Sequence, residues 1–290
     1  MSHVQGFIQP QNSQFRDFHE TFEQLSLAEI KASFSQLKMG TPLDTHWHKY
    51  FSGLIKIKEE KDIDALNELQ KVYDSVKHRF TDIEREQYRL VGLALKKIGW
   101  IYRKNKEYEK AYYYHNIRYQ YMTHYGSALE LHDAAISLDV DAYYLKDLKL
   151  SEFWLLISKQ CASNIQNPID RTKSVAISDN NLASTYCLQK KFKEAIEYIF
   201  QSLDTWIDYE SLTGPHENKV IWAYYGVADI YEAWAQHKKE TQQNYSDEQN
   251  ESKRYFQKSL DLALQRQILE TDIMSIQNRL HKVTELDSIS

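Results

Sequence analysis

Glycine and proline, the residues that most often interrupt helices, are scarce in this sequence. The 290 residues include 8 glycines and 4 prolines. A β or α/β fold needs a turn at the end of every strand, and turns depend heavily on these two residues. The scarcity therefore predicts an all-α protein with long helices. The prolines lie in short stretches that read as loops: Pro10, Pro42, Pro168 and Pro215.

The sequence also lacks a long apolar run and an excess of positive charge. No stretch of about 18 apolar residues occurs, and the first residues lack the apolar centre of a signal peptide. The net charge is −5, so no general attraction to nucleic acid or to an anionic membrane is expected. Cys161 and Cys187 are interpreted as buried thiols in a reducing compartment. We expect a cytoplasmic protein without a direct nucleic-acid or membrane partner.

Motifs that carry catalysis or bind cofactors are missing as well. No glycine-rich phosphate loop, Gly-x-Ser-x-Gly, His-Glu-x-x-His or Cys-x-x-Cys occurs. His46 and His48 flank Trp47, but two residues apart on a helix they do not share a face, as a pair of metal ligands would need to. We therefore expect a protein that is not an enzyme and that has no metal site and no cofactor.

Tyrosines recur at a nearly constant spacing. In two of the copies an alanine follows nine residues later, Ala111 after Tyr102 and Ala195 after Tyr186. Small and apolar residues precede the tyrosine at helical steps, as Gly99 does in the first copy. Each copy therefore reads as two helices that cross at small residues. The recurring residues are 42, 42 and 45 positions apart: Tyr102, Tyr144, Tyr186 and Tyr231.

This pattern resembles the tetratricopeptide repeat, which has a hydrophobic residue, a small residue and a tyrosine in its first helix, then an aromatic residue and an alanine in its second. The usual repeat has about 34 residues, so each helix here carries roughly one extra turn. The resemblance covers about residues 90–265 and implies a right-handed α-solenoid of about four to five helix pairs with capping helices at both ends. A weak further copy includes Gly53, Ala65, Leu69 and Val72. The alternative is an irregular helical bundle.

Three regions follow from this pattern. Residues 1–85 form an N-terminal tail and a helical cap, 86–267 the repeats, and 268–290 a C-terminal capping helix and tail. Within the last repeat, residues 237–250 are polar without an apolar face and read as a solvated extension or loop. In the N-terminal region we expect helices over about 16–37, 44–58 and 62–78.

Capping boxes mark expected helix starts, because a hydroxyl and a carboxylate three residues apart satisfy amides that lack a partner in the first turn. Three such pairs occur: Ser26 with Glu29, Thr81 with Glu84, and Ser127 with Glu130.

In repeats of this type the first helix of each pair lines a concave face, where an extended peptide lies. The surface expected there is basic at one end and aromatic and acidic at the other, which suits a peptide whose ends differ in polarity. An asparagine amide both donates and accepts, as a peptide unit does, and the resemblance places Asn181 where peptide-binding members carry an asparagine. The alternative is that some of these residues pack against a neighbouring or capping helix. The candidate residues are Lys96, Lys97, Trp100, Arg103, Asp139, Asn180, Asn181, Ser184, Trp222, Tyr225 and Asp229.

The leading hypothesis is a non-catalytic module that binds a peptide or protein segment. Repeats of about 40 residues, rich in tyrosine and asparagine, also resemble the bacterial receptors for signalling peptides, the Rap phosphatases and the PlcR-type regulators. That resemblance implies control of a response regulator or of transcription, although no motif matches residue by residue and no helix-turn-helix is found. A third hypothesis is a scaffold that forms a homodimer through tyrosine-rich second helices: Tyr112, Tyr113, Tyr114, Tyr119 and Tyr121.

Overall fold

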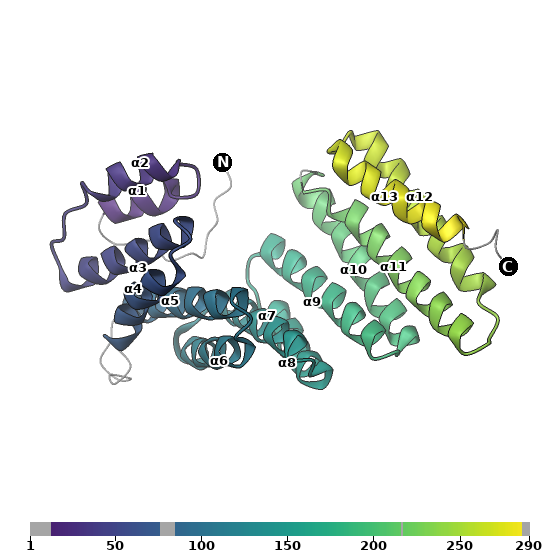
Figure 1. The fold of residues 1–290 in the computed structure, drawn as a ribbon, viewed down its shortest axis with the longest axis horizontal. Helices are drawn as coiled ribbons and strands as arrows, with labels where there is room; N and C mark the ends of the chain where they lie inside the picture. The colour runs from purple at the N-terminus through teal and green to yellow at the C-terminus, as the bar shows by residue number, and fades with distance from the viewer. Residues whose placement is uncertain (1–12, 76–84, 216, 286–290) are drawn as a thin grey trace. The chain divides into compact units, whose positions relative to one another are not determined.

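The computed structural model describes residues 13–75, 85–215 and 217–285, and Figure 1 shows them as a succession of helices. Within these ranges every regular element is an α-helix, and none is a strand. The predicted all-α fold is confirmed. The chain divides into two compact units, Met1–Lys146 and Asp147–Ser290, each of which is described by itself.

Unit 1 contains two short helices followed by five longer ones. Consecutive helices from α3 to α7 pack against each other. The helices α3 and α4 cross closely at Gly53, where an added Cβ would lie 2.8 Å from Cγ of Leu69. The bounds are α1 (Ser13–Thr21), α2 (Leu27–Phe34), α3 (Pro42–Lys58), α4 (Asp62–Asp74), α5 (Arg85–Lys104), α6 (Tyr108–Tyr125) and α7 (Ala128–Tyr144).

The N-terminal region differs from the expected single helix over residues 16–37. It contains two helices instead, because Ser26 starts a new one. Glu29 N donates to Ser26 Oγ at 3.4 Å, while Ser26 N donates to Glu29 Oε2 at 2.8 Å. The capping box at Ser127 is confirmed in the same way, and the one expected at Thr81 lies outside the described residues.

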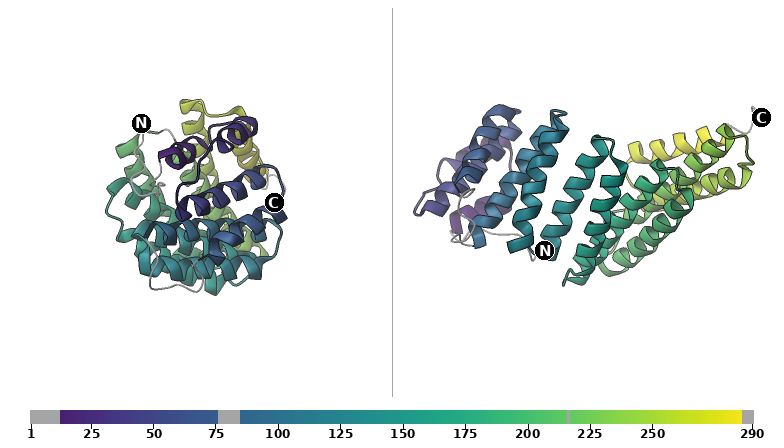
Figure 2. Two further views of the ribbon diagram at one scale, coloured as in Figure 1. Left: turned by 90° about the vertical axis from the view of Figure 1, so that its left-hand side faces the viewer. Right: turned by 90° about the horizontal axis from the view of Figure 1, so that it is seen from below.

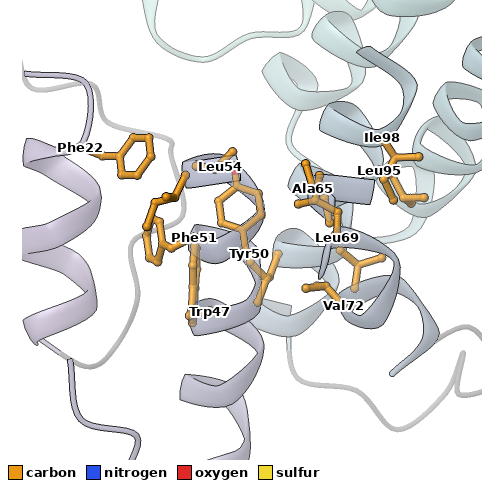
Figure 3. Close-up of a cluster of buried hydrophobic side chains, with 14 of the residues drawn as sticks. Phe22, Trp47, Tyr50, Phe51, Leu54, Ala65, Leu69, Val72, Leu95 and Ile98 are labelled. Atoms are coloured by element: carbon orange, nitrogen blue, oxygen red, sulfur yellow. The ribbon is translucent and has the colours of Figure 1, made fainter. Parts of the chain in front are cut away.

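The core of unit 1 extends along both sides of α3, and phenylalanine rings cluster on one of them. The Phe18 ring meets the Phe51 ring edge to face, with centroids 4.9 Å apart. Trp47 is buried and donates its indole N–H to Glu86 Oε1 at 2.9 Å, which satisfies the polar atom of this large side chain. Figure 3 shows the two sides, with Phe22, Trp47 and Phe51 on one and Ala65, Leu69, Val72, Leu95 and Ile98 on the other.

Unit 2 is a stack of six helices, and Figures 1 and 2 show its long helices side by side along their lengths. Each helix packs on the next one in the sequence, and α11 also contacts α9. The last helix begins close to the start predicted for the C-terminal capping helix. The bounds are α8 (Leu148–Ser163), α9 (Pro168–Leu188), α10 (Phe192–Thr213), α11 (Lys219–Glu240), α12 (Ser246–Arg266) and α13 (Glu270–Glu285).

The polar segment 237–250 is mostly helical. The helix α11 continues to Glu240 and α12 begins at Ser246, so only residues 241–245 connect them. Lys238 Nζ donates to Glu248 Oε1 at 2.5 Å and joins the extended ends of the two helices. The segment is therefore a solvated extension of two helices with a short connection, and not a long loop.

Buried serines join the two helices of a pair in unit 2. Each lies on a second helix and donates its hydroxyl to a backbone carbonyl of the first helix, so the two backbones approach closely. The sequence does not distinguish Ser202 and Ser259 from solvated serines, whereas Ser252 begins the displaced second half of the fourth copy of the repeat. The contacts are Ser202 to Ala176 (2.9 Å), Ser252 to Ala228 (3.0 Å) and Ser259 to Ile221 (2.9 Å).

The turn inside each pair contains a residue in the left-handed backbone region. In four of the five turns the following amide donates to a carbonyl five residues earlier, as Lys191 N does to Tyr186 O at 2.9 Å. The same bond joins Glu107 N to Tyr102 O, so the recurring tyrosine accepts the turn's hydrogen bond in these two copies. The left-handed residues are Glu60 (φ 60°), Lys106 (62°), Lys146 (61°), Lys190 (61°) and Gln242 (58°).

A Cβ in the left-handed region costs roughly 1 kcal/mol, so glycine should be favoured at Lys190. We expect Lys190→Gly to exceed Lys190→Ala in free energy of unfolding by about 1 kcal/mol, measured by urea denaturation. Asp204, exposed in the middle of α10, provides the control. There glycine should be less stable than alanine by about 1 kcal/mol. If glycine and alanine rank in the same order of stability at Lys190 and at Asp204, the described turn geometry is contradicted.

Candidate functional site

The candidate residues all lie on first helices of pairs, α5 and α7 in unit 1 and α9 and α11 in unit 2. We call the side of these helices that is turned away from the second helices the first-helix face. The two units are considered separately: unit 1 carries Lys96, Lys97, Trp100, Arg103 and Asp139, and unit 2 carries Asn180, Asn181, Ser184, Trp222, Tyr225 and Asp229.

Two of the basic residues of α5 are engaged by α7. Lys96 Nζ lies 2.9 and 2.7 Å from the two carboxylate oxygens of Asp133. Arg103 Nε donates to Asp141 Oδ1 at 2.6 Å, and its Nη2 donates to Ser137 O at 2.7 Å. Arg103 therefore holds α5 to α7, and Lys96 combines this role with partial exposure.

His115 of α6 completes this network, although little in the local sequence indicates this role. Its Nδ1 lies 2.5 Å from Asp141 Oδ2, and its Nε2 lies 3.2 Å from Lys96 O. The buried ring lies against Gly99, where an added Cβ would be 2.4 Å from Nε2. Gly99, the small residue before Tyr102, is the one feature of the sequence that points to this contact, because a small residue indicates close packing.

Asp133 is shared by two cations, since Arg118 Nη2 also donates to its Oδ2 at 2.5 Å. Burial acts to raise the pKa of Asp133, but the charges of Arg118 and Lys96 outweigh this effect and hold that pKa well below its usual range. The carboxylate is therefore ionised wherever the protein is folded near neutral pH.

The other candidate residues of unit 1 differ in accessibility. Trp100 is 41% exposed, and Lys104 Nζ lies 5.7 Å from the centre of its ring. Lys97 is partly buried, and burial followed by the charge of Lys96 lowers its pKa. Asp139 is buried at 5% exposure, so burial disfavours the predicted role of this residue in ligand binding.

On α9 of unit 2, two adjacent asparagines have polar groups to offer. Asn180 and Asn181 are partly buried, and neither side-chain amide is hydrogen-bonded to any residue that the structure describes. Asn180 lies beside α11, where its Oδ1 would be 3.7 Å from a Cβ added to Gly226. Ser184 is exposed and donates its hydroxyl to Asn180 O at 3.1 Å.

On α11 the aromatic residues remain at the surface, and two acidic residues share one cation. Trp222 is 38% exposed and meets Tyr225, whose ring packs edge to face on a buried ring of α12. Arg279 of α13 donates to Asp229 Oδ1 and to Glu232 Oε2, both at 2.7 Å. The capping helix thus supplies one counter-charge for two carboxylates, so the acidic end predicted for this surface keeps part of its negative charge.

The described residues contain no group of three or more His, Cys, Asp or Glu side chains placed to hold a metal ion. None of the helices in the same ranges is both long and apolar enough to span a bilayer.

No family model and no curated protein matches the sequence, but solved structures match its fold. Kinesin light chain TPR-like repeats from Podosopora anserina match with a TM-score of 0.56 at 12% identity, over 76% of this chain and 94% of that one. The fold is tetratricopeptide-like. The predicted fold class is thus confirmed.

Two other tetratricopeptide-like neighbours extend over nearly all of this chain. The apo form of RapI matches with a TM-score of 0.59 at 8% identity, covering 93% of this chain and 94% of that one. NprR in complex with its cognate peptide NprX matches with a TM-score of 0.51 at 15% identity, covering 94% of this chain and 73% of that one. At these identities the likeness establishes the fold alone.

The network around His115 predicts the effect of one methyl group. Gly99→Ala should lower the free energy of unfolding by about 1–3 kcal/mol, because the ring of His115 is fixed by hydrogen bonds on both sides and cannot move aside. Gly40→Ala is the control, since its nearest atom would be 3.5 Å away. If the two variants unfold at the same urea concentration, the close contact at Gly99 does not exist in solution.

Cys187 offers a pH-dependent test of the surface around α9. Burial, followed by the charge of Asp229, raises the pKa of its thiol to about 11. A thiol with that pKa is on the order of one-thousandth ionised at pH 8, so alkylation by iodoacetamide should be slow there and accelerate up to about pH 11.

The charge contribution can be separated in a Cys161→Ser background. Asp229→Asn removes a negative charge that opposes the thiolate, so it should lower the pKa of Cys187 and speed its alkylation at pH 8. If the alkylation rate of Cys187 instead rises with a midpoint near the ordinary pKa of a cysteine, about 8.5, the described burial of this thiol is contradicted.

Proposed function

We propose that this protein is a non-catalytic module that binds an extended peptide or protein segment on its first-helix face. The observation that supports this most directly is the pair of partly buried amides on α9, Asn180 and Asn181, which have no hydrogen bond to a described residue. A polar group that is withdrawn from water without a partner is costly. A peptide backbone unit fits such an amide because it presents one donor and one acceptor.

An aromatic residue of α11 lies one helical turn from the place where this helix meets Asn180. Gly226 of α11 is next to Asn180, and Trp222 precedes Gly226 by one turn on the same helix. Trp222 is 38% exposed. Exposed tryptophans that become covered contribute a large share of binding energy at protein interfaces. The amides and the ring together support a ligand held by its backbone and by one apolar side chain.

The tetratricopeptide-like fold agrees with this proposal, because helical repeats of this kind use extended surfaces for binding. One structure of the same fold, NprR, contains a bound peptide. A signalling-peptide receptor of the Rap or PlcR type, acting on a response regulator or on transcription, is a second candidate. The observation that favours it is that RapI shares the fold over almost the full length of both chains.

The third hypothesis, a homodimer formed through the tyrosines of α6, receives less support. Tyr121 is 2% exposed, and Tyr114 stacks on Tyr102 with centroids 5.3 Å apart. Of the five tyrosines considered, only Tyr113 is exposed, at 59%. These rings mainly build unit 1, so they leave little aromatic surface for a second copy.

The proposal is tested with the peptide or partner that co-purifies with the protein, identified by mass spectrometry. Asn181→Ala and Trp222→Ala should each weaken binding by about 1–3 kcal/mol in isothermal titration, without a change in melting temperature. Asn278→Ala, an exposed asparagine on α13, is the matched control. The ligand should also slow alkylation of Cys187, two turns beyond Asn180 on α9.

If neither Asn181→Ala nor Trp222→Ala changes the affinity, the ligand does not bind on the first-helix face of unit 2. Equal weakening by Asn278→Ala would mean that the loss is not specific to this surface.

A further inference from the structure

Positive charge exceeds negative charge where α5, α6 and α7 meet. Asp133 is shared by Lys96 and Arg118. Asp141 is shared by Arg103 and His115. Even with His115 counted as neutral, three permanent cations therefore face two carboxylates.

Lys97 adds a fourth cation to the same place. No carboxylate of the described residues forms an ion pair with its Nζ. The charges that act on it most are those of Lys96, Glu23 and Lys58, and Glu23 is already paired with Lys58 at 3.2 Å. Burial and the charge of Lys96 lower the pKa of Lys97, and the opposing charge of Glu23 does not offset this effect.

Neighbouring carboxylates do not remove the excess. Glu130 lies 3.6 Å from Arg89 and is therefore occupied. Asp133 and Asp141 are eight residues apart and therefore share one face of α7. Asp139 is buried on another side of the helix, because its spacing from them does not match whole helical turns. Among the side chains of this cluster, Lys96, Lys97, Arg103 and Arg118 thus face only Asp133 and Asp141, which leaves two positive charges in excess.

The same stretch of α5 carries an exposed aromatic ring. Trp100 lies three and four residues after Lys97 and Lys96, so the three side chains share one side of the helix. Trp100 is 41% exposed, and Lys104 lies over its ring one turn further on. From Lys96 to Lys104 the helix rises about 12 Å, which matches about four residues of an extended chain better than one small anion.

We propose that the surface of α5 formed by Lys96, Lys97 and Trp100 binds an acidic peptide segment. Carboxylates of the segment lie beside the two lysines, and a neighbouring apolar side chain covers the indole of Trp100. This inference deepens the proposed function, since it gives the charge of the ligand. It concerns the basic end of the surface predicted from the sequence.

The experiment uses the full chain and an array of 12-residue peptides. Each peptide has one central phenylalanine or leucine with two to four glutamates at varied spacings, and each has counterparts in which glutamine or lysine replaces glutamate. Acidic members should bind at least about tenfold more tightly than their glutamine counterparts at low salt and weaken as salt rises. The proposal is overturned if no acidic member binds better than its counterpart.

Variants locate the effect on α5. Lys97→Glu should weaken binding of the acidic peptides about tenfold or more, and Trp100→Ala should do the same for every member with an apolar residue. Because Lys97 is partly buried, Lys97→Met retains its packing and provides a milder variant that should still reduce the preference for glutamate. Circular dichroism confirms that each variant is folded.

Controls carry the same changes elsewhere on the surface. Lys149→Glu alters an exposed charge on α8, and Tyr113→Ala removes an exposed ring on α6. Both should bind the acidic peptides as the unmodified protein does. Wild-type affinity in Lys97→Glu, or equal losses in Lys97→Glu and Lys149→Glu, would overturn the proposal.

The two proposals can fail separately. Asn181→Ala reports on the amides of unit 2, and Lys97→Glu reports on the charge of unit 1. If Asn181→Ala binds the acidic peptides with unchanged affinity and still prefers glutamate, the α9 amides do not bind the ligand. That result supports the α5 surface. Peptide binding that depends on Asn181 but shows no glutamate preference retains the proposed function and refutes this inference.

Discussion

The close approach of the two helices in each pair is the constraint on which the rest of this structure depends. In unit 2 the backbones are near enough for serine hydroxyls of second helices to reach carbonyls of first helices. In unit 1 the crossing of α5 and α6 leaves room at Gly99 for an imidazole and no more. Small residues at the crossing leave little space there, so many of the large side chains lie along the rims of the pair. The rims are where tyrosines stack and where ligand-facing side chains can project.

The parts of the fold that could be predicted are those set by residues close in sequence. The step from Tyr102 to Ala111 lies within one pair and fixes a turn and a crossing, so it identified the repeat. Ser26 also acted locally: its capping box ended the expected long helix, which shows that a good helix start outweighs a continuous apolar pattern. The exact extent of α11 and α12 was harder to predict, because polar sequence is compatible with both a solvated helix and a loop.

The candidate surface was predicted less completely, because ion pairs between distant positions decide which side chains remain available. Lys96 and Asp133 are 37 residues apart, and Arg279 and Asp229 are 50 apart. Nothing in the local pattern of α5 or α11 reveals these partners. Uncharged side chains such as Asn181 and Trp222 stay available more often, because no distant counter-ion competes for them.

The last helix also determines what can happen at the end of unit 2. The helix α13 uses Ile276 and Val283 to cover the apolar side of the preceding pair, and both are buried. Its opposite side presents exposed polar residues, among them Gln277, Asn278 and His281. A further helix pair, or the end of another molecule, would find few apolar side chains there to pack against. End-to-end fibre growth from this surface is therefore disfavoured, even at the high local concentrations that many copies in one assembly would create.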